Sequence, residues 1–122
     1  MIVECLTVAI GGAVGSVLRY LLGLIPFNES GVFPVNTLIV NIVGALAIGV
    51  ITAVVARNSG VNDYLILFMQ VGVCGGFTTF STFALETGDL ISGGSVWLAI
   101  LYVFLSVFFG VLAVFLPEIV LR

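Results

Sequence analysis

Four long runs of apolar residues, separated by short polar turns, constrain this chain more than any other feature. A helix needs about 20 apolar residues to cross the hydrocarbon core of a bilayer, and each run has roughly that length. With 61% hydrophobic and 7% charged residues, the chain has too little polar side chain to cover a water-exposed surface. We therefore predict an all-α integral membrane protein with one membrane domain, residues 1–122. The predicted transmembrane helices are residues 2–25, 36–56, 63–89 and 96–116.

The third run is interrupted near its middle by the double glycine Gly75-Gly76, which is followed by a segment rich in Thr and Ser. Each glycine costs a helix about 1 kcal/mol, and Ser and Thr side chains compete for backbone hydrogen bonds. We expect the third helix to break at residues 75–79, near mid-membrane. Irregular backbone at that depth is tolerated only where protein buries it or where it lines a wet path. The break therefore predicts a functional site.

The predicted break offers binding groups for ions of both signs. Carbonyls freed between Gly75 and Thr79 would suit a bare cation. The half-helix that begins near Thr79 would present free amides at its N-terminus, which suit an anion. Phe80 and Phe83 are three residues apart and so share a helix face. Because a phenyl ring has an electropositive edge, these two rings can face an anion without carrying a charge.

Other polar side chains inside the apolar runs need partners too. Asn41 places a primary amide within the second run, where an unsatisfied amide costs several kcal/mol. An interhelical hydrogen bond is the simplest account of it. Tyr102 and Ser106 share one row of the fourth helix and should face protein or water. Together with the hydroxyls of Ser81 and Thr82, the Asn41 amide and the phenyl edges favour a path that binds a small anion weakly enough to release it.

Basic residues are few, and there is no lysine or histidine. Arg19 lies inside the first run, where it is either a snorkelling anchor or a cation with a pore-mouth or structural role. The other arginines, Arg57 and Arg122, flank the opposite side of a four-helix bundle. Two charges against one give almost no bias under the positive-inside rule. The chain is therefore expected to insert both ways, and two opposed copies would form an inverted pair.

The motif at residues 75–83, GGFTTFSTF, resembles that of the Fluc (CrcB) family of fluoride channels. The likeness extends to Glu86 after the motif, to residues 40–44 in the second run, and to the glycines and Arg19 of the first. It implies an antiparallel, dual-topology homodimer in the plasma membrane, with two fluoride pores and a central structural sodium ion. The implied role is passive export of cytoplasmic fluoride.

The resemblance also implies roles for individual residues. The implied fluoride-path residues are Asn41, Phe80, Ser81, Thr82, Phe83, Glu86, Tyr102 and Ser106. The sodium ion would be held by the carbonyls of Gly75 and Thr78, and Arg19 would have a vestibular or structural role. Gly110 departs from the family pattern, because some members carry a polar residue there, so the polar track can be shorter in this chain.

Two other functions fit a small four-helix membrane protein. A proton-coupled multidrug exporter needs a carboxylate deep in the first helix, but Glu4 lies at its extreme end. A structural subunit of a hetero-oligomer would explain the glycine-rich helix faces but not the hydroxyls beside a double glycine. An enzyme is not expected, because the sequence has no histidine, no lysine and no paired carboxylates across a plausible site.

Overall fold

The structure is a computed structural model, and it describes residues 1–29 and 31–121. Within these ranges it contains helices and no strand, which confirms the predicted all-α class. Four helical segments are long and apolar enough to cross a membrane, so the chain is a multi-pass membrane protein. Arg122, which was counted with Arg57 against Arg19 under the positive-inside rule, lies outside the described residues. The elements are α1 (Ile2–Gly23), α2 (Val35–Arg57), α3 (Asp63–Ile66), the π-helix η1 (Leu67–Cys74), α4 (Gly75–Phe77), α5 (Phe80–Ser92) and α6 (Val96–Val120).

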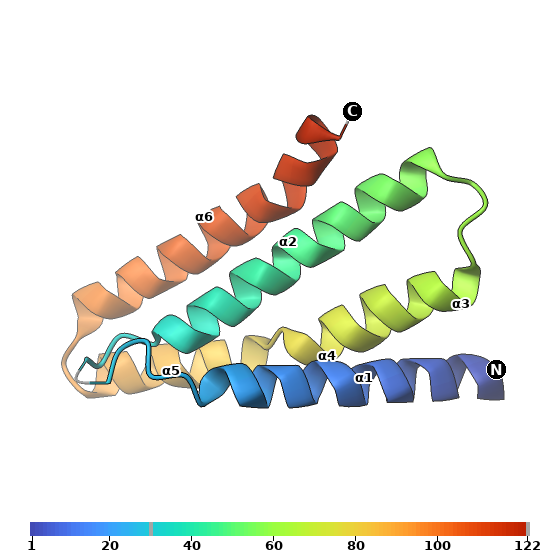
Figure 1. The fold of residues 1–122 in the computed structure, drawn as a ribbon. Coiled ribbons are helices and arrows are strands. Elements are labelled where there is room, and N and C mark those ends of the chain that lie inside the picture. The colour runs from blue at the N-terminus through green and yellow to red at the C-terminus, as the bar shows by residue number, and fades with distance from the viewer. Residues whose placement is uncertain (30, 122) are drawn as a thin grey trace.

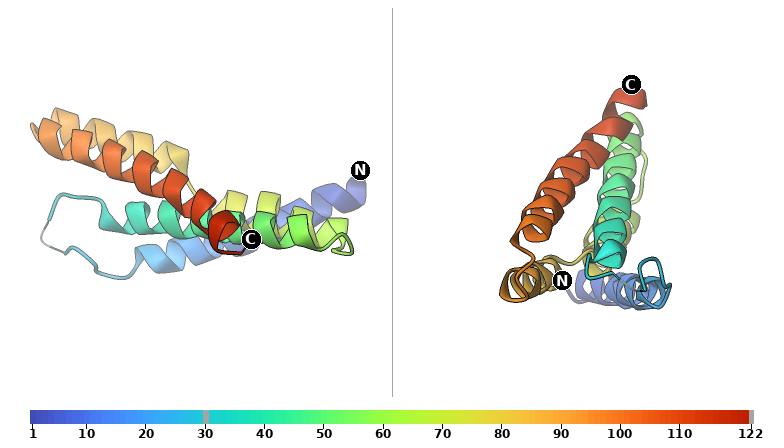
Figure 2. Two further views of the ribbon diagram at one scale, coloured as in Figure 1. Left: turned by 90° about the horizontal axis from the view of Figure 1, so that it is seen from above. Right: turned by 90° about the vertical axis from the view of Figure 1, so that its left-hand side faces the viewer.

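The helices are arranged as two pairs (Figures 1 and 2). In one pair, α1 lies along η1 and α4, which belong to the first half of the third span. In the other pair, α6 lies along α2, and it also packs against α5. The third span is therefore shared, because its first half packs on α1 and its second half on α6. The N-terminus and the turn between α2 and α3 lie at one end of the molecule, opposite the turn between α5 and α6 (Figure 1).

Glycines allow α1 to approach the third span until the two backbones touch. Gly11, Gly15 and Gly72 are buried in this contact. A Cβ atom at Gly11 would lie 2.6 Å from the carbonyl oxygen of Phe68, and one at Gly72 would lie 2.8 Å from the Cα atom of Gly11. Such distances leave no room for a side chain. The glycines on this face of α1 thus form a helix-packing surface.

The helix ends differ slightly from the predicted ones, for local reasons. Helix α1 ends at Gly23 rather than at residue 25, because the Asn36 side chain donates to the carbonyls of Leu22 (3.1 Å) and Ile25 (2.7 Å) as the chain turns away. Helix α6 continues to Val120, with Pro117 inside it rather than after its end. Proline removes one backbone donor but does not prevent the next turn, and Leu121 N–H donates to the Pro117 carbonyl at 2.9 Å.

The packed interior is small, and most large apolar side chains point outward. A buried cluster forms where α5 meets α6, around Leu90, Ala99 and Tyr102. The outer faces of α1 and α6 expose Val, Ile, Leu and Phe along their whole length. Trp97, 82% exposed, lies in the first turn of α6, where an indole suits the membrane–water boundary. These faces are suited to lipid and not to water.

Candidate ion-binding site at the helix break

The third span breaks at Thr78 and Thr79. Thr78 (φ −78°, ψ 155°) and Thr79 (φ −148°, ψ 118°) are extended, whereas Gly75 and Gly76 remain helical. The break is therefore narrower than the predicted residues 75–79. The physical reason is that Gly76 serves helix packing: a Cβ atom there would lie 2.6 Å from the carbonyl oxygen of Gly12 in α1. Gly76 lets α4 approach α1, and the two threonines turn the chain.

Asn41 of α2 closes the broken backbone through two hydrogen bonds. Its Oδ1 accepts from Thr79 N–H at 2.8 Å, and its Nδ2 donates to the Thr79 carbonyl at 3.1 Å. In an uninterrupted helix, Thr79 N–H would donate to the Gly75 carbonyl instead. The interhelical hydrogen bond expected of Asn41 is thus present, and its partners are the backbone groups of Thr79 at the break. One N–H of the amide is left for another acceptor.

Arg19 of α1 satisfies a second backbone group at the break. Its Nε donates to the Gly76 carbonyl at 3.2 Å. In a continuous helix this carbonyl would accept from Phe80 N–H instead. A cation at this point also lies at the C-terminal end of α4, the negative end of the helix dipole. This contact with the break is consistent with a pore-mouth or structural cation, the alternative to a snorkelling anchor. Arg19 also lines an open pocket of about 170 Å³, with Gly23, Asn36, Thr37, Val40, Thr79 and Thr82.

The threonines at the break satisfy local backbone groups. Thr79 caps α5, because its Oγ1 accepts from Thr82 N–H at 3.2 Å and donates to Thr82 Oγ1 at 3.2 Å. Thr78 Oγ1 donates to the Cys74 carbonyl at 2.9 Å. Ser81, one of the predicted path residues, is exposed in this single subunit. Thr82 is the better placed of the two predicted hydroxyls, since it borders the pocket beside Arg19.

A row of aromatic rings leads away from the break. The rings of Phe80 and Phe83 are 5.7 Å apart, and that of Phe83 is 5.1 Å from Tyr102. Phe33, from the connection before α2, lies edge-on to Tyr102 at 5.6 Å. Phe80 is 78% exposed, whereas Tyr102 is completely buried. The predicted pair of phenylalanines does share one face, and Phe33 is an aromatic neighbour that the sequence did not indicate.

Two buried hydroxyls make no hydrogen bond of normal geometry among the described residues. They are Tyr102 Oη and Ser106 Oγ, one helical turn apart on α6. The Thr37 side chain of α2 is a polar neighbour of Tyr102 Oη but does not meet that geometry. A buried hydroxyl without a hydrogen bond costs roughly 1–3 kcal/mol on protein-based scales. The two hydroxyls form the polar row that the spacing of the fourth helix predicted, and its Tyr102 end lies beside Phe83. A water molecule or a small anion would satisfy both groups.

Glu86 lies further along α5 and accepts a hydrogen bond from Thr37 Oγ1 of α2. It lines an open pocket of about 320 Å³ together with Asp89, at the end of the molecule near the turn before α6. Sequence reasoning did not select Thr37 as a site residue. The available signal was its position one turn before Asn41, on the same face of the second helix.

Gln70 is a second polar residue inside the helices that the sequence reasoning did not select. It lies in η1, and its Nε2 donates to Thr52 Oγ1 of α2 at 3.0 Å, which in turn donates to the Ile48 carbonyl at 2.8 Å. The signal was an amide in the middle of an apolar run. An open pocket of about 280 Å³ is lined by Asn41, Gly44, Ala45, Ile48, Gln70, Cys74, Gly75, Thr78 and Val114.

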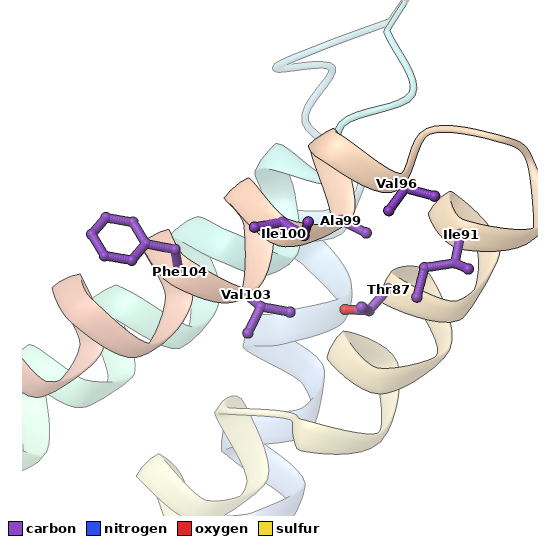
Figure 3. A pocket seen from close by; sticks show the side chains of 7 residues that line it. All are labelled: Thr87, Ile91, Val96, Ala99, Ile100, Val103 and Phe104. Carbon is purple, nitrogen blue, oxygen red and sulfur yellow. The ribbon is translucent and has the colours of Figure 1, made fainter.

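A wider pocket between α5 and α6, about 410 Å³, has a different character (Figure 3). Its lining is Thr87, Ile91, Val96, Ala99, Ile100, Val103 and Phe104. The Thr87 hydroxyl is the only oxygen among the side chains shown, and it donates to the Phe83 carbonyl at 2.7 Å. This pocket offers no free polar group to an ion and suits a lipid chain or another apolar surface.

The sequence matches a known family and its members. The family model described as "CrcB-like protein, Camphor Resistance (CrcB)" matches residues 6–117. A Novosphingobium aromaticivorans protein named fluoride-specific ion channel FluC is 45% identical over 118 residues, covering 94% of this chain and 93% of its own. Proteins of the same name from Thermus thermophilus (46% over 112 residues; 91% and 89% coverage) and Agrobacterium fabrum (44% over 109 residues; 88% and 87%) are similar to the same extent. With its broken third span and a family match over nearly its whole length, the chain belongs to the CrcB family.

Proposed function

We propose that this protein is a fluoride-selective channel that lets cytoplasmic fluoride leave the cell passively across the plasma membrane. The observation that carries the proposal is the pair of buried hydroxyls without a hydrogen bond, Tyr102 Oη and Ser106 Oγ, of which Tyr102 lies beside the ring of Phe83. Relatives over 40% identical carry the name of fluoride-specific channels. The activity is transport and not catalysis.

The hydroxyls of Tyr102 and Ser106 and the neighbouring ring edges suit a small, strongly hydrated anion. Hydroxyl donors replace part of the hydration shell, and ring edges add weak positive potential without a fixed charge. Contacts of this kind let an ion enter and leave, because none of them holds it tightly. Arg19 would add positive potential beside the break while its Nε remains bonded to the Gly76 carbonyl. In this scheme Asn41, Phe80, Phe83, Ser81, Thr82, Tyr102, Ser106 and Glu86 belong to the path.

The channel would be a dimer of opposed copies with two pores. Phe80 supports this part of the proposal, since its ring is 78% exposed next to the break and the polar row. A second subunit would cover that ring and close a path that one subunit leaves open to the side. With Arg19 and Arg57 toward opposite ends of the bundle, no charge bias prevents insertion in both orientations.

A sodium ion between the two subunits fits the groups available at the break. Because Thr79 N–H donates to Asn41, the Gly75 carbonyl lacks its usual helical donor. The Gly75 and Thr78 carbonyls would supply neutral oxygen ligands, which suit a monovalent cation. Such an ion would be structural, holding the two broken helices together.

Fluoride efflux from liposomes tests the proposal. Purified protein is reconstituted at low density, and fluoride and chloride release are recorded with ion-selective electrodes. We expect rapid fluoride release and negligible chloride release. Absence of fluoride release from folded, dimeric protein would refute the channel, and equal release of both ions would refute its selectivity.

A further inference from the structure

The polar row on α6 stops halfway along the helix. Continued at helical spacing, the row is Tyr102, Ser106, Gly110 and Val114, so its second half carries no hydrogen-bonding side chain. A Cβ atom at Gly110 would meet nothing within 4 Å, which leaves open space at that level. If the proposed path runs the length of α6, another element must supply its donors beyond Ser106.

Gln70 lies where those donors are needed. It shares the open pocket of about 280 Å³ with Val114, the apolar end of the α6 row, and with Asn41. A pocket of that volume has room for several water molecules, since each occupies about 30 Å³ in the liquid. The two carboxamides, Asn41 at the break and Gln70 from η1, therefore border one space opposite Val114.

The Gln70 side chain is held in place by one hydrogen bond and keeps free hydrogen-bonding capacity. Only one of its polar groups is bonded, since Nε2 donates to Thr52 Oγ1 at 3.0 Å. Thr52 is itself oriented by its own bond to the Ile48 carbonyl at 2.8 Å. The second N–H of Nε2 and the whole of Oε1 have no partner among the described residues. A carboxamide that only braced two helices would not need to face a pocket.

We propose that Gln70, oriented by Thr52, is a further anion-donor residue that continues the ion path on the α2 and η1 side, where α6 provides only Gly110 and Val114. This inference rests on the proposed function. Its chemistry matches that of the hydroxyl row, because an amide N–H is a neutral donor that binds a fluoride or its water weakly.

Paired variants separate a path role from a bracing role. Gln70→Met keeps the length of the side chain but removes its donors, and Thr52→Val removes the same interhelical hydrogen bond while leaving the Gln70 amide in the pocket. We expect Gln70→Met to lower fluoride flux about tenfold, as for loss of one hydrogen bond to an anion. Thr52→Val should lower flux by less, and both should assemble normally on size-exclusion chromatography.

A rescue variant makes the test sharper. Val114→Thr is isosteric and restores a hydroxyl to the α6 row, so it should recover part of the flux of Gln70→Met, which a bracing role would not predict. Normal flux in Gln70→Met overturns the inference and leaves the channel intact. Equal losses in Gln70→Met and Thr52→Val, without rescue by Val114→Thr, also overturn it. A wild-type protein without fluoride flux would refute the proposed function and this inference with it.

Discussion

Asn41 and Thr79 exchange a pair of hydrogen bonds, 2.8 Å and 3.1 Å long, that hold the broken third span against α2. This pairing gives one side chain both a structural and a proposed transport role. The N–H and carbonyl of Thr79, in the extended backbone of the break, are thereby both satisfied by a neighbouring side chain.

Asn41→Asp should nearly abolish fluoride flux and destabilise the fold. The carboxylate loses the donor to the Thr79 carbonyl, and it adds a negative charge beside the proposed path. Losing one buried hydrogen bond costs about 1–3 kcal/mol, which thermal unfolding in detergent would detect. Asn62→Asp, at the N-cap of α3, is the control and should retain both stability and flux, because a carboxylate oxygen can still accept from Tyr64 N–H. An active, stable Asn41→Asp protein would contradict both roles.

Phe80→Ile and Phe83→Ile should lower fluoride flux without preventing assembly. Isoleucine fills similar space but has no electropositive ring edge. Phe115→Ile is a suitable control, since Phe115 is 53% exposed on the outer face of α6. Liposome flux and size-exclusion chromatography give the two readouts. Unchanged flux in both variants would count against the role of the ring edges.

Tyr102→Phe should change stability and transport in opposite directions. Removing a buried hydroxyl that has no partner should leave the folded protein as stable or stabilise it by about 1 kcal/mol. If the hydroxyl serves the ion path, flux should nevertheless fall, and Ser106→Ala should behave alike. Stability and flux that fall together would indicate that the Tyr102 hydroxyl is bonded in the assembled protein and serves packing.

Gly11→Ala should impair folding, whereas Gly12→Ala should not. A Cβ atom at Gly11 would lie 2.6 Å from the Phe68 carbonyl oxygen, whereas one at Gly12 meets nothing within 4 Å. Overpacking of this kind costs typically about 1–3 kcal/mol. The yield of folded protein and its unfolding temperature would report the difference between these neighbouring positions. Equal behaviour of the two variants would show that the contact between α1 and η1 is loose.

Replacing sodium with a large organic cation should weaken dimer assembly if the Gly75 and Thr78 carbonyls hold sodium. The loss should be restored by adding sodium, because binding to the folded state alone stabilises it by mass action. Size-exclusion chromatography at low protein concentration measures the dimer fraction. An unchanged dimer fraction across sodium concentrations would remove the proposed ion.

The sequence was sufficient for the class of fold, because four apolar runs of membrane-spanning length permit few alternatives. It also located the polar row of Tyr102 and Ser106, since helical spacing is a local property. The position of the break was harder to predict. Gly75 and Gly76 are equally consistent with a broken helix and with a close helix contact, and only the position of α1 shows that Gly76 serves the contact.

Partners across the fold could not be read from the sequence. Asn41 clearly needed a hydrogen bond, but its partner is a backbone group 38 residues away. Asn36 looks like a local polar residue at the start of α2, yet its amide binds carbonyls at the end of α1. Gln70 and Thr52 give no sign in the sequence that they meet. In each case the identity of the partner depends on how the helices are packed in three dimensions.

The order of Asn41 and Thr79 along the chain also matters while the protein is being made. Because α2 precedes the third span, the amide that closes the break is synthesised, and can enter the bilayer, before Thr78 and Thr79 emerge from the ribosome. Asn41 is therefore already available to Thr79 when the third span enters the bilayer. In a chain with α2 and the third span exchanged, the Thr79 peptide groups would enter the bilayer before Asn41 is made, and each unsatisfied backbone group in lipid costs several kcal/mol.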